Sequence, residues 1–141
     1  MNEPIKIICY TAGTARGNPG PAAAGVYITD DEGTMISETA EVIGNSTTIF
    51  AAYHAVMLGL QTLTEEFGEA TKTMQFELRL DNELVKQQLN SEIPMTEPGL
   101  VPMFIEVHNL RVTHFPQLIL KHILQSENTE AIRLVNEALD A

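Results

Sequence analysis

The residues with the most potential for chemistry are a few acids and histidines in the second half of the chain. Asp81 directly follows residues 74–80, where apolar and polar side chains alternate as in a half-buried strand. His122 ends a later apolar run, and Glu127 and Glu130 follow it. Carboxylates and imidazoles bind divalent cations, and two such ions held about 4 Å apart can activate a water molecule. Several acids would have to converge on one point to support that chemistry.

The other reactive side chains have simpler interpretations. Cys9 is the only cysteine, which excludes an intrachain disulfide, and it lies in an apolar run. We interpret it as a small buried hydrophobe in a strand. His54 lies in a segment of helical spacing, and we interpret both it and His122 as packing or surface histidines. The acidic stretches 30–32 and 65–69 are interpreted as solvated surface.

Composition limits the possible partners. The chain has 141 residues, 44% of them apolar, with eight Lys and Arg against nineteen Asp and Glu and a formal net charge of −11. Proteins that bind the phosphate backbone of nucleic acids usually have a basic surface patch. Strong general binding of nucleic acid is therefore not expected here. A small basic groove is still compatible with this composition. No apolar run approaches the ~20 residues needed to span a bilayer. We expect a soluble cytoplasmic protein without a membrane segment.

Hydrophobic periodicity predicts a single α/β domain over residues 1–141. Apolar runs or alternation indicate strands, and helical spacing, with Thr47 or Thr48 as the first cap, indicates helices. The expected order is βββαβααβα, a five-stranded mixed sheet flanked by helices. The strands are expected near 5–11, 23–29, 34–43, 74–80 and 117–123, and the helices near 48–63, 82–89, 100–112 and 128–139.

This order and four local segments resemble the ribonuclease H-like superfamily, and within it the compact bacterial and archaeal form of type 1 ribonuclease H. The segments lie in the family's order and span almost the whole chain: Tyr10 to Gly25, Thr47 to Leu60, Asp81 to Asn90, and His122 to Leu139. The resemblance implies the ribonuclease H fold. It also implies, for active members, cleavage of the RNA strand of RNA–DNA hybrids with two magnesium ions.

The resemblance breaks at the metal-binding positions. The family pattern places acids at four positions, where this chain has Ala12, Ala52, Asp81 and Ile132. Aliphatic side chains offer no lone pair to a cation, so we expect none of these positions to be catalytic and Asp81 to be at most a weak, vestigial metal ligand. Asp81 is alternatively interpreted as the cap of the helix that begins near Asn82. Ile132 would instead extend an apolar stripe with Val135 and Leu139.

Substrate-contacting positions have changed as well. Thr48 and Ile49 stand where family members often have two Asn residues, and the segment 122–125 departs from the family's Pro-Arg ending. Arg16 and Asn18 keep the family's residue types, so they are our candidates for weak contact with a sugar-phosphate backbone.

We therefore predict a catalytically inactive ribonuclease H-like protein, a pseudo-nuclease that acts as a binding or regulatory module. Its partner would be an unidentified protein or, weakly, RNA or DNA, and no cofactor is expected. The main alternative is a ribonuclease H that needs Mg²⁺ or Mn²⁺, either with ligands relocated to Asp81 with Glu127, Glu130 or His122, or with its acids removed by engineering. Ala12 and Ala52 fit natural loss or laboratory truncation, whereas Ile132 is an unusual choice for engineering. A third alternative is a structural subunit that pairs with itself, and the sequence leaves the oligomeric state open.

Overall fold

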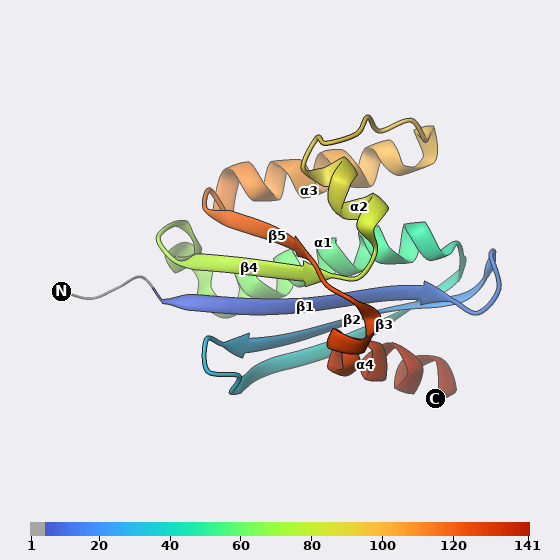
Figure 1. The fold of residues 1–141 in the computed structure, drawn as a ribbon, viewed down its shortest axis with the longest axis horizontal. Helices are drawn as coiled ribbons and strands as arrows, with labels where there is room; N and C mark the ends of the chain where they lie inside the picture. Colours follow the sequence, from blue (N-terminus) through green and yellow to red (C-terminus); the bar gives the residue numbers. More distant parts are fainter. Residues whose placement is uncertain (1–4) are drawn as a thin grey trace.

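The computed structural model describes residues 5–141 as one mixed sheet with helices on both sides (Figure 1). The strands form the spatial order β3-β2-β1-β4-β5, in which β1 pairs antiparallel with β2 and parallel with β4. The predicted order of elements and the five-stranded mixed sheet are confirmed. The elements are β1 (Lys6–Ala15), β2 (Gly20–Asp30), β3 (Met35–Ser46), α1 (Thr48–Phe67), β4 (Gln75–Leu80), α2 (Glu83–Leu89), α3 (Val101–His114), β5 (Leu118–His122) and α4 (Thr129–Asp140).

The two faces of the sheet bury separate apolar clusters. Successive residues of a strand point to opposite faces, so alternate positions of β1 serve different helices. Ile7 and Cys9 belong to the main core, which α1 and α3 cover. Ala12 packs in a smaller cluster with residues of α4, and Tyr10 lies against its edge. The fully buried Cys9 confirms the interpretation of this residue as a core hydrophobe, and burial raises the pKa of its thiol.

The first strand and the first helix are both longer than predicted. β1 continues to Ala15 because residues 12–15 pair with residues 22–25 of β2, although Ala12, Gly13 and Ala15 have little strand propensity of their own. The cap prediction is confirmed at Thr47, whose side chain accepts a hydrogen bond from the Phe50 amide at 3.2 Å. α1 then runs to Phe67. None of the helices in residues 5–141 is both long and apolar enough to cross a bilayer.

One buried acid of the sheet is held by basic neighbours. Glu77 on β4 is 8% exposed, hydrogen-bonds to the Arg79 guanidinium and lies 3.6 Å from the Lys6 ammonium. Burial alone would raise the pKa of the Glu77 carboxyl, but the Arg79 hydrogen bond and the charges of Arg79, Lys6 and Lys121 outweigh burial and lower it. The Arg79 guanidinium also donates to the Tyr10 hydroxyl at 2.8 Å.

This arrangement predicts a pH dependence of stability. Because the folded-state pKa of Glu77 is lowered, its contribution is present above the ordinary pKa of glutamate and is lost as pH falls through the lowered value. We expect Glu77→Gln to reduce the free energy of unfolding at pH 7 by on the order of 1–2 kcal/mol. The difference between the two proteins should shrink on acidification, as measured by urea unfolding at several pH values. A difference that is constant with pH would contradict this account.

Candidate functional site

A pocket of about 390 Å³ opens at the end of β4, beside the last residues of β1, which continues past it. Its wall includes Ala12 from β1, Asp81 just after β4, and Ile132 from α4. Thr11 pairs with Leu80 in the parallel register, so Ala12, the next residue of β1, and Asp81, the first residue after β4, are placed near each other. The structure thus brings three of the four family-equivalent positions to one pocket. Thr14, Thr48, Asn82, Glu83 and Gln125 supply most of its polar lining.

The fourth family-equivalent position, Ala52, lies in the main core. Its side chain is 5% exposed and does not line the pocket. α1 approaches β1 closely here, because a Cβ atom at Gly13 would lie 2.0 Å from the Ala51 carbonyl oxygen. Gly13 therefore allows the contact that sets the first turn of α1 against the end of β1.

The α4 side of the pocket is aliphatic. Ala12 packs in the smaller cluster with Ala131 and Val135, and Ile132 and Leu139 pack against it. This confirms the predicted apolar stripe at 132, 135 and 139. A carboxylate here would stand beside apolar neighbours, at a cost of several kcal/mol unless a cation or hydrogen bonds compensated it.

Asn128 is the residue that sequence reasoning missed. It is fully buried just before α4, and its side-chain amide donates to the Thr11 carbonyl at 2.9 Å and to the Asp81 carboxylate at 2.8 Å. One amide thereby connects β1, the end of β4 and the start of α4. Its side-chain oxygen is buried with no hydrogen-bond partner within residues 5–141. The sequence predicts a helix over 128–139 that includes Asn128, whereas α4 begins one residue later, at Thr129.

The interpretation of Asp81 as a helix cap is wrong. The cap of α2 is Asn82, whose side-chain oxygen accepts from the Val85 amide at 3.1 Å. Asp81 instead accepts a hydrogen bond from Asn128, so this acid fixes the start of α4. Both residues are good helix caps, and sequence alone does not separate neighbours of similar capping preference.

We expect Asn128→Ala to lower the free energy of unfolding by about 2–3 kcal/mol, because it leaves one carbonyl and one partly buried carboxylate without their donor. Asn109→Ala is the matched control, since Asn109 is an exposed asparagine on α3. Urea unfolding of both variants measures the effect. Equal stability of the two variants would show that the Asn128 contacts do not hold the strands and α4 together.

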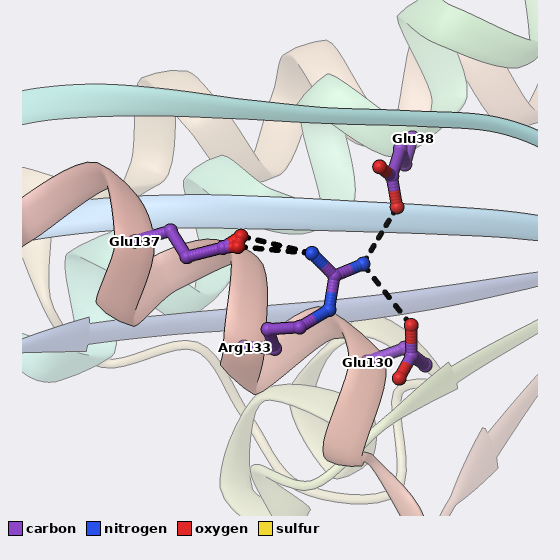
Figure 2. Close-up of polar contacts among 4 residues, drawn as sticks. All are labelled: Glu38, Glu130, Arg133 and Glu137. Atoms are coloured by element: carbon purple, nitrogen blue, oxygen red, sulfur yellow. Dashed lines mark hydrogen bonds and ion pairs between the residues drawn. The ribbon is translucent and has the colours of Figure 1, made fainter.

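The acids proposed as relocated ligands are engaged elsewhere. Glu127 accepts from the Leu124 amide at 2.9 Å, and Glu130 pairs with Arg133 at 3.0 Å. Figure 2 shows Arg133 reaching three glutamates, of which Glu38 comes from β3 and Glu137 from the next turn of α4. The hydrogen bonds that Arg133 donates to Glu38, Glu130 and Glu137 raise the pKa of its guanidinium. This cluster ties α4 to the sheet edge.

The donor set of the pocket does not fit a two-metal centre. Within residues 5–141, no group of three or more His, Cys, Asp or Glu side chains is arranged to hold a metal ion. Glu83, which we had not singled out, is the one carboxylate that joins Asp81 in the lining of this pocket. Two carboxylates without further protein ligands fall short of what a pair of divalent ions requires. His122 lies half-buried at the end of β5 and is not part of the pocket lining.

The candidates for nucleic-acid contact lie outside the pocket lining. Arg16 is exposed and pairs with Asp140 near the end of α4 at 2.6 Å. The Asn18 side-chain oxygen accepts from the Thr48 amide at 3.0 Å, at the start of α1. Both contacts are structural, and a role of either residue in binding a sugar-phosphate backbone stays a prediction. His54 is half-buried and contacts Glu41 on β3 at 2.8 Å, which agrees with its interpretation as a packing or surface histidine.

Comparison with known proteins identifies the class. The profile of the reverse transcriptase-like family matches residues 10–138, and the chain belongs to this family. Its fold is that of ribonuclease H, as the similarity to solved structures shows. LC11-RNase H1, isolated from compost by a metagenomic approach, is 40% identical with a TM-score of 0.91, over 96% of each chain.

Two further comparisons also show similarity to ribonucleases H. A ribonuclease HI of Halobacterium salinarum is 33% identical over 135 residues, which cover 96% of this chain and 65% of that protein. The chain therefore spans about two thirds of the length of this relative. LC11-RNase H1 has also been solved in complex with an RNA/DNA hybrid; that structure is 39% identical with a TM-score of 0.91, over 95% of this chain and 96% of that one. The resemblance to compact type 1 ribonuclease H is confirmed.

Proposed function

We propose that this chain is a non-catalytic ribonuclease H-like module that binds RNA–DNA hybrids weakly and does not cut them. The observation that supports the proposal is that Ala12, Ala52 and Ile132 stand at three of the four positions where the family pattern is expected to have metal-binding acids. Two of these three line the pocket together with Asp81. A cation would therefore meet methyl groups where the chemistry requires oxygen donors.

Charge supports the weak binding in this proposal. LC11-RNase H1, which shares 39% of its residues with this chain, forms a complex with an RNA/DNA hybrid. The present chain carries a formal net charge of −11, and its exposed Arg16 is paired with Asp140. Affinity for a phosphate backbone rises with the number of phosphates that Lys and Arg neutralise, so we expect binding that is weak and falls steeply with salt.

Incubation with a labelled RNA–DNA hybrid and Mg²⁺ or Mn²⁺ tests the proposal. We expect cleavage no faster than in a sample without protein, and saturable but salt-sensitive binding of the hybrid in fluorescence anisotropy. Asp81→Asn is the control for any trace activity. Metal-dependent cleavage that disappears in this variant would overturn the non-catalytic assignment, and a complete lack of binding at low salt would overturn the assignment of the ligand.

A second candidate is a weakened nuclease that uses Asp81 together with Glu83. The observation in its favour is that both carboxylates line the same pocket. This candidate predicts metal-dependent cleavage that is lost in both Asp81→Asn and Glu83→Gln. The non-catalytic proposal predicts that neither substitution changes the background rate.

A further inference from the structure

A second pocket, of about 370 Å³, lies between the end of α2, the last turns of α3 and the segment that leads into β5. It shares no lining residue with the pocket at the end of β1. Its polar side includes Ser91, His108 and Arg111, and its apolar side includes Val112, Phe115 and Leu118. This open hollow combines a few polar groups with an apolar wall, the two kinds of surface that small-molecule sites bring together.

Arg111 is the cation of this pocket. Its guanidinium donates to the Leu89 carbonyl at 2.8 Å and to the Asn90 side-chain oxygen at 3.4 Å, so only two of its five N–H donors have these partners. No carboxylate lies within 4.0 Å of it in residues 5–141, whereas the chain's other arginines, Arg16, Arg79 and Arg133, each pair with an acid.

The lack of an acidic partner is notable because acids outnumber bases by nineteen to eight in this chain. The end of α2 offsets part of the Arg111 charge, but a helix terminus carries only about half of a unit charge. Burial lowers the pKa of the guanidinium, which marks a cation that has lost water without gaining a counter-charge. An anion in the pocket would supply that counter-charge.

The backbone beside Arg111 has an unusual conformation. Ser91 has a φ of 58°, in the left-handed region, and it is the one non-glycine residue with positive φ in residues 5–141. This conformation ends α2, because the Ser91 amide donates to the Gln88 carbonyl at 3.1 Å and the Glu92 amide donates to the Gln87 carbonyl at 2.8 Å, as at many helix ends. Here the conformation places Ser91 at the polar side of the pocket, next to Arg111 and His108.

We propose that this pocket binds a small carboxylate carried on an apolar body. A guanidinium can donate two parallel hydrogen bonds to the two oxygens of one carboxylate. Val112, Phe115 and Leu118 offer an apolar surface to an aromatic or aliphatic group. A phosphate dianion fits less well, because one arginine would face two negative charges within a protein of net charge −11. The inference does not depend on the function proposed for the other pocket.

Phenylacetate is a suitable probe, with the uncharged phenylacetamide as its control. We expect saturable ¹H–¹⁵N shift changes around residues 89–91 and 108–118 with the acid, and affinity at least about tenfold lower for the amide, the loss expected for one charge-assisted contact. The same titration with inorganic phosphate compares its affinity with that of phenylacetate. Equal affinity for acid and amide, or tighter binding of phosphate than of phenylacetate, would overturn the proposal.

Two variants of α3 locate the site. Val112→Glu adds a negative charge at the pocket, where Val112 is 68% exposed, and should weaken phenylacetate binding by about tenfold. Thr113→Glu adds the same charge to the same helix but lines a different groove, with Gln61 and Glu106, and should leave the affinity almost unchanged. Both positions are exposed, so neither variant should impair folding. Equal weakening in the two variants would contradict a site at Arg111.

Discussion

Restoring the three carboxylates together, as Ala12→Asp, Ala52→Glu and Ile132→Asp, is expected to produce metal-dependent cleavage of an RNA–DNA hybrid. The rate should rise by at least about a thousandfold over the unmodified chain, because a metal pair supplies several kcal/mol of transition-state stabilisation. The measurement is single-turnover cleavage of a labelled hybrid with Mg²⁺. The same variant with Asp81→Asn added should lose the gain, since Asp81 is the family acid that this chain retains.

The restored variant also has a readout that does not depend on activity. Ile132→Asp puts a charge against the cluster of Ala12 and Val135, and Ala52→Glu puts one at a position that is 5% exposed, so the metal-free variant should be less stable. Mg²⁺ should raise its melting temperature, because a ligand that binds only the folded state stabilises it. The unmodified chain should show no such rise. A restored variant that folds but neither binds metal nor cuts the hybrid would contradict the assignment of these positions.

Gly13→Ala is expected to have the largest effect on stability. The added Cβ atom would lie 2.0 Å from the Ala51 carbonyl oxygen and 2.2 Å from the Ala51 carbonyl carbon. Both are backbone atoms of α1, so no change of side-chain rotamer relieves the overlap, and the helix must move away from β1. We expect a loss of about 3 kcal/mol or more in the free energy of unfolding, or failure to fold.

Gly99→Ala is the control for the loss of a glycine. A Cβ atom there would meet nothing within 4 Å, and the backbone of Gly99 does not have positive φ. This variant should be neutral or slightly stabilising, because alanine restricts the unfolded chain. Circular dichroism with urea unfolding compares the two variants. Similar stability of both would mean that α1 does not approach β1 as closely as described.

The fold was predictable because its signals are local and repeated. Alternation over residues 74–80 and helical spacing from Ile49 to Leu63 each identify an element, and together they fix the order along the chain. The end of β1 was not predictable in this way. Ala12, Gly13 and Ala15 have little strand propensity, and the conformation of residues 12–15 is set by pairing with β2, which is a tertiary effect.

The candidate site was predicted in part. Family resemblance named Ala12, Asp81 and Ile132, and the fold brings these three to one pocket. The resemblance assigned no role to Asn128, because this role depends on the distances from its side-chain amide to the Thr11 carbonyl and the Asp81 carboxylate. The pocket at Arg111 had no sequence signal either, since the missing acid partner becomes evident only when neighbours are known in three dimensions.

A crystal soaked in Mn²⁺ tests the central claim most directly, because anomalous scattering locates each bound ion. The proposed non-catalytic site, with aliphatic side chains at Ala12 and Ile132, predicts at most one weakly occupied ion beside Asp81 and none beside these two residues. Two well-occupied ions about 4 Å apart in this pocket would contradict it, since that spacing defines a working metal pair.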